Sequence, residues 1–157
     1  MKHVFSLLDR VVLVLLGAAL VTLVSVGGAQ IVLRETVGTP LPWATEFSVV
    51  LMIWATMLSG YVGVRRNSHL SADFLGLNMS ERKRRALRTA ALLLSLLFVV
   101  VYGWQSRIVI DAMEGIPFTS LPFTQPVLYM SLPVGALLMA MALLERLWRD
   151  LRPGATV

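Results

Sequence analysis

Uncharged, mostly apolar residues fill four long stretches of this chain. These stretches, which contain no Asp, Glu, Lys or Arg, are residues 11–33, 47–64, 89–106 and 115–144. A helix rises about 1.5 Å per residue, so about 20 apolar residues cross the hydrocarbon core of a bilayer. The pattern therefore predicts an all-α membrane protein with four transmembrane helices. We expect a single four-helix domain over residues 1–157, with spans at about 11–33, 43–64, 86–110 and 125–147.

The composition supports the same interpretation. Hydrophobic residues make up 57% of the 157 residues and charged residues only 15%, against about 25% charged residues in a typical soluble domain. The segments left between four spans are short loops. They leave no room for a separate soluble domain, so we expect the whole chain to be one membrane unit.

The charges are distributed unevenly between the two sides of the predicted membrane domain. Twelve of the fourteen Lys and Arg residues lie in segments that four crossings place on one side, and the other side carries only Arg34 and Arg107. Basic loops face the cytoplasm in most membrane proteins. We expect an inner-membrane protein of a bacterium with both termini in the cytoplasm. This distribution also accounts for the net charge of +5 without nucleic acid as a partner.

Several function classes lack the residues they need. The chain has no Cys, and its two histidines, His3 and His69, both lie outside the expected spans. Thiolate chemistry, Cys-ligated metal and a haem held between two spans are therefore excluded. No nucleophile-elbow, zinc-protease or nucleotide-binding motif occurs. We expect no enzymatic activity, no cofactor and no metal site.

The segment between the second and third spans has features of a short helix. Ser71 can cap it, Asp73 falls in its first turn, and Leu70 and Leu75 can form a hydrophobic staple. We expect a short interfacial helix here, lying in the cytoplasmic headgroup layer; an ordered loop with buried leucines is the alternative. Ser80 then begins the third long helix.

Glu46 is the acidic residue closest to the interior of a span, about one turn inside the second helix and beside Trp43. It has two interpretations. Acidic residues within membranes are often buried and functional, whereas a carboxylate near a helix N-terminus with an aromatic anchor is typical of the outer interface. Contact with another subunit is compatible with both.

The outer end of the third helix carries Arg107, Asp111 and Glu114. Arg107 and Asp111 are four residues apart and can pair, although the order cation before anion is the weaker one. The two acids face either solvent or a basic partner. The loop after them, residues 115–124, is too apolar for a solvated loop and is expected in the interface or against another chain. Pro133 predicts a bend in the last helix.

Small residues form a row on the second helix at Ala55, Ser59 and Gly63. Such a row permits close approach of another helix, either within this chain or from a partner. Trp54 lies on the same helix and is expected to serve packing or an interface. No ionisable residue lies in the middle of any span.

Several of these motifs together resemble those of a known family. The second helix opens with Trp43-Ala-Thr-Glu46 and continues through Trp54, Gly60 and Gly63 to Arg65-Arg66 and His69-Leu-Ser-Ala-Asp73. The last helix contains Tyr129-Met-Ser-Leu-Pro133-Val-Gly135. In this order and spacing, over roughly residues 8–150, they resemble the small membrane subunit of TRAP transporters, the DctQ-like family.

The resemblance implies a role in a tripartite, sodium-coupled secondary transporter that imports an organic acid anion. The expected partners are a large multi-span permease subunit, a periplasmic substrate-binding protein and membrane lipids, with the small subunit packing against the permease and helping to dock the binding protein. Residues expected at partner or lipid interfaces are Trp43, Glu46, Trp54, Ala55, Ser59, Gly63, Arg65, Arg66, His69, Arg107, Asp111 and Glu114.

Two other functions are compatible with four spans. A self-sufficient small multidrug exporter would need an acidic residue inside its first span, where this chain offers only Thr22, Ser25 and Gln30. An assembly or structural protein of another inner-membrane complex would need no such residue and is the stronger alternative.

Overall fold

The computed structural model describes residues 2–39, 41–66 and 80–151, and it is all-helical apart from the connections. Its helices are α1 (Lys2–Val37), α2 (Pro42–Arg66), α4 (Glu81–Ala112), α5 (Pro126–Tyr129) and α6 (Ser131–Leu151). Four helical stretches are long and apolar enough to cross a membrane, the fourth of them comprising α5 and α6. The expectation of an all-α protein with four candidate spans is confirmed. The short helix expected near residues 70–77 lies outside the described residues.

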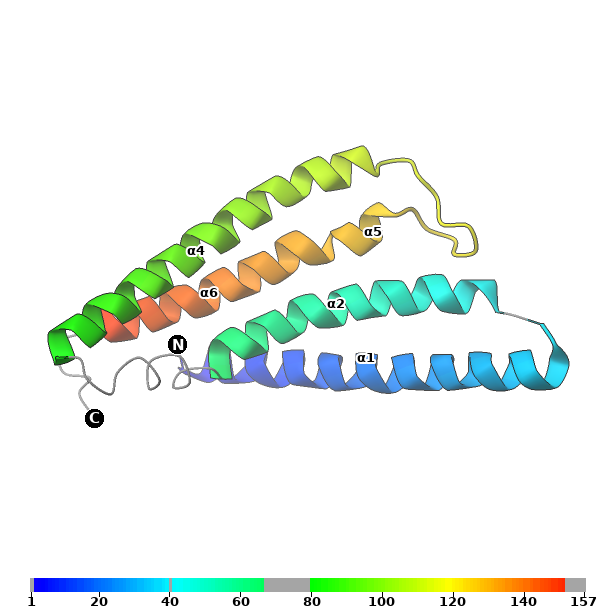
Figure 1. The fold of residues 1–157 in the computed structure, drawn as a ribbon, viewed down its shortest axis with the longest axis horizontal. Helices are drawn as coiled ribbons and strands as arrows, with labels where there is room; N and C mark the ends of the chain where they lie inside the picture. The colour runs from blue at the N-terminus through cyan, green and yellow to red at the C-terminus, as the bar shows by residue number, and fades with distance from the viewer. Residues whose placement is uncertain (1, 40, 67–79, 152–157) are drawn as a thin grey trace.

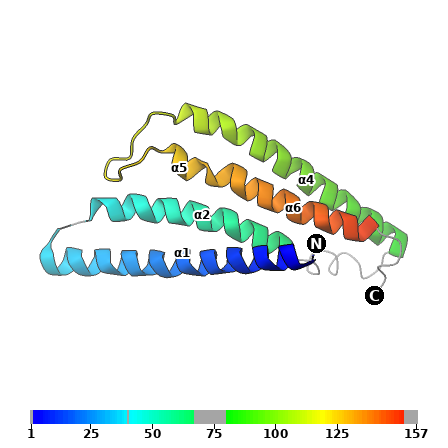
Figure 2. The ribbon, with the colours of Figure 1, turned by 180° about the vertical axis from the view of Figure 1, so that it is seen from behind.

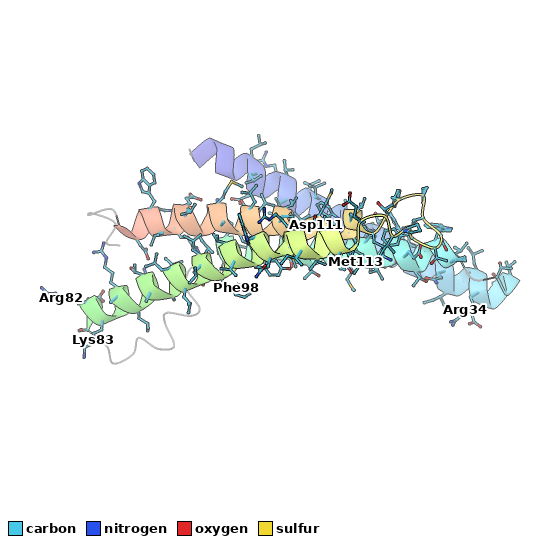
Figure 3. The ribbon with its side chains drawn as sticks, turned by 90° about the horizontal axis from the view of Figure 1, so that it is seen from above. Arg34, Arg82, Lys83, Phe98, Asp111 and Met113 are labelled. Carbon is cyan, nitrogen blue, oxygen red and sulfur yellow. The ribbon has the colours of Figure 1, made fainter. Side chains whose placement is uncertain are left out.

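The long helices lie side by side in one layer, in the order α1, α2, α6, α4 (Figure 1). The view from behind shows the same order (Figure 2). Seen from the α4 edge, α1 and α4 splay apart toward the end that carries Arg82 and Lys83 (Figure 3). The layer is thus open and twisted. The span that comprises α5 and α6 has one-third of its most apolar segment buried, against 6% for each of the edge helices α1 and α4.

The two ends of the layer differ in chemistry. The first residues of α1 and α4 and the last residues of α2 and α6 lie at one end, which we call the basic end (Figure 1). The α1–α2 connection and the segment from Met113 to Gln125 lie at the opposite end, which we call the loop end. Arg82 and Lys83 are at the basic end, whereas Arg34 is at the loop end (Figure 3).

Helix α1 extends beyond its expected span on both sides. Its 36 residues correspond to about 54 Å, well above the roughly 30 Å of a hydrocarbon core. It ends at Val37, and the next residue, Gly38, has a φ of +72° and donates its N–H to the carbonyl of Arg34 at 3.1 Å. A glycine in this left-handed conformation is a common helix terminator because it has no Cβ to clash.

The last span is interrupted at the position that its proline predicts. Pro133 has no N–H to donate to the carbonyl of Tyr129, and α5 ends at Tyr129 while α6 begins at Ser131. The Ser131 hydroxyl is buried and donates to the carbonyl of Leu128 at 2.7 Å. The expected bend is therefore observed as a break in the helix, stabilised in part by a serine side chain.

Small residues bring the central helices close together. A Cβ at Gly135 of α6 would lie 2.8 Å from the Cβ of Met57 in α2, and a Cβ at Gly103 of α4 would lie 2.9 Å from the Cβ of Ala136 in α6. Both distances are too short for real carbon atoms. These two glycines therefore set the spacing between α6 and its neighbours.

Candidate functional site

Titratable side chains gather at the basic end, where Arg65 of α2 lies between two acids from neighbouring helices. Its Nη2 and Nε lie 2.5 and 2.9 Å from the two carboxylate oxygens of Asp9 in α1. Its Nη1 pairs with Oε2 of Glu145 in α6. The Arg65 side chain is only 16% exposed. One guanidinium therefore connects three helices by charge-assisted hydrogen bonds, the strong class of such bonds.

Tyr61 lies one turn before Arg65 and completes this cluster. Its hydroxyl donates to Oδ1 of Asp9 at 2.6 Å, and its ring is fully buried with Val12 and Ala142. The apolar contact and the polar cluster thus join the same three helices at adjacent levels. We call Asp9, Tyr61, Arg65 and Glu145 the Arg65 cluster.

The contacts continue to the fourth helix. Arg85 of α4 donates to the backbone carbonyl of Asp150 in α6 at 2.6 Å. Arg88 lies 3.7 Å from the Asp150 carboxylate, which is a looser ion pair. On α6 itself, Arg149 pairs with Glu145 at 2.8 Å. Polar contacts therefore connect α1 to α2, α2 to α6 and α6 to α4 at the basic end.

Glu46 makes the corresponding connection at the loop end. Its carboxylate accepts hydrogen bonds from the backbone N–H groups of Thr119, Ser120 and Leu121, at 2.8, 2.8 and 3.2 Å. Its side chain is neither fully buried nor free in solvent. Glu46 thus lies near the start of α2, and its carboxylate has partners within its own chain; its position at the outer interface stays a prediction.

The segment that Glu46 binds is a small hairpin, residues 115–125. Phe118 donates its N–H to the carbonyl of Phe123 at 3.1 Å, and Gln125 donates to Ile116 at 2.9 Å. The rings of Phe118 and Phe123 meet edge to face at 6.4 Å. The apolar loop expected from the sequence is thus an ordered hairpin with the side chains of Ile116 and Phe123 exposed, and its place in the interface or against another chain stays a prediction.

Two further hydrogen bonds hold the helices together toward the loop end. Trp54 of α2 donates its indole N–H to the carbonyl of Val127 in α5 at 3.2 Å. Gln30 of α1 donates to the hydroxyl of Thr45 in α2 at 3.0 Å. Trp54 therefore serves packing within this chain, one of the two roles expected for it.

The three residues of the small-residue row on α2 have different surroundings in the structure. Ala55 is buried, Ser59 is exposed, and a Cβ at Gly63 would meet nothing within 4 Å. Close helix contacts instead use Gly103 and Gly135, as described above. Part of the row therefore packs inside the chain, and Ser59 and Gly63 face open space.

The remaining candidates lie apart from one another. Trp43 is 42% exposed at the start of α2, and its ring lies 6.2 Å from that of Phe47. Arg66 is exposed at the opposite end of α2, and Asp111 and Glu114 are exposed at the end of α4. Arg107 stacks its guanidinium 3.6 Å above the Trp104 ring rather than pairing with Asp111. His69 lies outside the described residues.

Sequence reasoning did not single out Asp9, Tyr61 or Glu145. A usable signal was present, because Asp9, Arg65 and Glu145 each flank an uncharged stretch on the same predicted side. Acids and bases at one membrane level on neighbouring helices are natural ion-pair partners. The order of the helices in the layer was also needed to decide which acid would reach Arg65.

A layer of four long apolar helices, with polar contacts at its two ends, is typical of a polytopic helical membrane protein. The model of the DctQ component of tripartite ATP-independent periplasmic transporters matches residues 23–153. The chain therefore belongs to this family and is the small membrane component of a TRAP transporter, a family of transport proteins rather than enzymes.

A curated relative adds a second comparison. The chain is 31% identical over 120 residues to the sialic acid TRAP transporter permease protein SiaT of Haemophilus influenzae (strain 86-028NP). The alignment covers 71% of this chain and 18% of the relative. This chain thus corresponds to about a fifth of the length of that permease.

Proposed function

We propose that this DctQ component is a fixed scaffold subunit that packs against a large multi-span permease subunit and extends its frame in the membrane. The observation that carries the proposal is the open layer. Among the described helices, α1 packs along α2 and α4 packs along α6, so the layer keeps broad apolar surfaces that a closed bundle would bury. Such surfaces can lie against lipid or against another membrane protein.

The relative supports a permease as the partner. In SiaT, a segment similar to this chain is one part of a much longer permease chain. Because that segment and the rest of SiaT belong to one chain, they lie in the same membrane in a one-to-one ratio. We extend this arrangement to the present chain, with the permease as a separate subunit.

The polar contacts suit a fixed frame better than a moving substrate carrier. The Arg65 cluster joins α1, α2 and α6 at the basic end, and Glu46 binds the hairpin at the loop end. Helices connected at both ends resist sliding past one another. On this proposal the substrate and the coupling sodium ions bind in the permease, and no residue of this chain ligates them.

The proposal includes the rest of a tripartite importer. A periplasmic binding protein captures an organic acid anion, the chemical class to which the named substrate of SiaT belongs. Both termini of the present chain face the cytoplasm, so the hairpin faces the periplasm. The hairpin is then the part of this chain placed to contact the binding protein.

The experiment is purification of the tagged chain from its native membrane in mild detergent. We expect a large permease to co-purify at a constant ratio, and sodium-driven uptake of the organic acid to need both chains. Recovery of the chain from its native membrane without any permease attached would contradict the scaffold role. So would unchanged uptake by the permease in proteoliposomes that lack this chain.

A further inference from the structure

One face of α4 carries a shallow groove near each of its ends. The groove near the basic end has a volume of about 510 Å³ and is lined by Arg82, Arg85, Ala86, Thr89, Ala90 and Leu93. The groove near the loop end has a volume of about 370 Å³ and is lined by Trp104, Arg107, Ile108, Ile110 and Asp111. The proposed scaffold role uses neither of them.

The two grooves lie on the same face of the helix. Residues three or four apart share a helix face, and such steps lead from the first groove through Leu93, Leu97 and Val100 to Trp104. These three connecting side chains are 50%, 61% and 55% exposed. The face is therefore apolar in its middle and carries polar side chains only at its ends.

The distance between the charged groups matches a bilayer. Arg85 and Arg107 are 22 positions apart, which corresponds to about 33 Å along the helix axis. The hydrocarbon core is about 30 Å thick. Guanidinium groups at this separation lie at the headgroup levels of the two leaflets, with apolar side chains between them.

The groove at the loop end presents both signs of charge. The Arg107 guanidinium lies over the Trp104 ring, and its Nε donates to the Trp104 carbonyl at 3.3 Å. Stacking occupies the flat face of the guanidinium and leaves its terminal N–H groups able to bind a phosphate. These two contacts hold the Arg107 guanidinium toward Trp104 rather than toward Asp111.

The second charge is Asp111. Within the described part of the chain, no hydrogen bond or ion pair is recorded for its carboxylate. The groove thus holds a phosphate-binding cation and, one turn along, a carboxylate that can accept hydrogen bonds from an ammonium. An aromatic ring of the kind enriched at membrane interfaces completes it.

We propose that this groove binds the headgroup of a zwitterionic aminophospholipid such as phosphatidylethanolamine. Arg107 binds the phosphate, Asp111 accepts hydrogen bonds from the primary ammonium, and the acyl chains lie along Trp104, Val100 and Leu97. A choline headgroup carries no N–H to donate to Asp111, and a glycerol headgroup offers no cation. The groove therefore prefers ethanolamine over both.

The test measures which lipid contacts Trp104. The full chain, purified with its membrane partners, is reconstituted into phosphatidylcholine vesicles that contain a minor fraction of brominated lipid, with bromine near the glycerol end of the acyl chain. The brominated lipid is phosphatidylethanolamine, phosphatidylcholine or phosphatidylglycerol. The chain has four Trp residues, so the contribution of Trp104 is the quenching that is lost in Trp104→Phe.

We expect brominated phosphatidylethanolamine to quench Trp104 about two- to fivefold more than the other two lipids, the ratio that one exposed ion pair supplies. Asp111→Asn removes this preference and raises quenching by phosphatidylglycerol. Arg107→Gln lowers quenching by all three lipids. Glu114→Gln, an exposed acid outside the groove, is the matched control and leaves the preference unchanged.

Three results would overturn the proposal. Equal quenching by all three lipids would mean that the headgroup is not recognised. Stronger quenching by phosphatidylglycerol would mean that only Arg107 acts, as a simple anion site. Absence of quenching at Trp104 by any lipid would mean that another protein covers this face.

Discussion

Arg65 of α2 and Asp9 of α1 form a two-pronged ion pair, with nitrogen–oxygen distances of 2.5 and 2.9 Å. The same guanidinium reaches Glu145 of α6. Because one cation is shared by two acids from different helices, removal of Arg65 leaves Asp9 without its direct ion-pair partner and leaves Glu145 paired with Arg149 alone. Arg65 thus connects α1, α2 and α6 at the basic end through these two acids.

Arg65→Gln is expected to loosen the packing of these three helices. Loss of charge-assisted hydrogen bonds costs about 1.5–3 kcal/mol each when the groups are shielded, and the partial exposure of Asp9 and Glu145 favours the lower value for each bond. The measurement is thermal unfolding of the purified complex in detergent. Arg66→Gln, which changes an exposed neighbour, is the control. Equal melting temperatures for both variants would show that the cluster contributes no stability.

Tyr61→Phe tests the contribution of the Tyr61 hydroxyl separately from that of its ring. The variant keeps the buried ring and loses one hydrogen bond to Asp9, so we expect a loss of about 1 kcal/mol in unfolding free energy. Tyr102→Phe is the matched control, because its hydroxyl makes only a 3.8 Å contact with the sulfur of Met57. The prediction fails if the two variants unfold at the same temperature.

Glu46→Gln should release the hairpin at the loop end. A carboxylate accepts all three N–H groups of residues 119–121, whereas the NH₂ group of glutamine is a donor and cannot replace one of its oxygens. We expect faster amide hydrogen exchange at Thr119, Ser120 and Leu121, with the rest of the chain unchanged. Glu114→Gln is the control.

The effect of Glu46→Gln on function should be partial. The carboxylate positions a loop and is proposed to touch neither substrate nor sodium, so transport should fall by less than it does when the whole subunit is removed. Complete loss of transport with normal assembly would show that Glu46 acts directly in the transport cycle.

The sequence predicted four long apolar helices because about 20 uncharged residues in a row are stable in few conformations other than a transmembrane helix. It also predicted a bend near Pro133 from one missing N–H, which the structure shows as a break between α5 and α6. It could not predict that Glu46 binds the Thr119–Leu121 backbone, because 73 residues separate Glu46 from Thr119 and the loop conformation decides the contact. The order α1, α2, α6, α4, on which the Arg65 cluster depends, was likewise absent from the local pattern.

The orientation inferred from the basic residues can be tested with single cysteines. The chain has no Cys, so no background labelling has to be removed. We expect Thr119→Cys to react with a membrane-impermeant maleimide added to intact spheroplasts, and Lys83→Cys to react only after the membrane is opened. The opposite pattern would place the basic end outside and would contradict the positive-inside assignment.

Two glycines on neighbouring helices provide a test of the packing itself. A Cβ at Gly135 would lie 2.8 Å from Met57 Cβ, whereas a Cβ at Gly63 would meet nothing within 4 Å. We therefore expect Gly135→Ala to force α2 and α6 apart and to cost about 1–3 kcal/mol, as overpacking of a tight contact does.

Gly63→Ala is the matched variant, because it makes the same chemical change in a helix without the contact. Alanine has a higher helix propensity than glycine by about 1 kcal/mol, so in the isolated chain this variant should be neutral or slightly stabilising. In the complete transporter the same variant reports on the partner. If Gly63→Ala weakens co-purification of the permease while the isolated chain keeps its melting temperature, the open side of α2 at Ser59 and Gly63 lies against the permease. Unchanged co-purification would place the permease on another face of the layer.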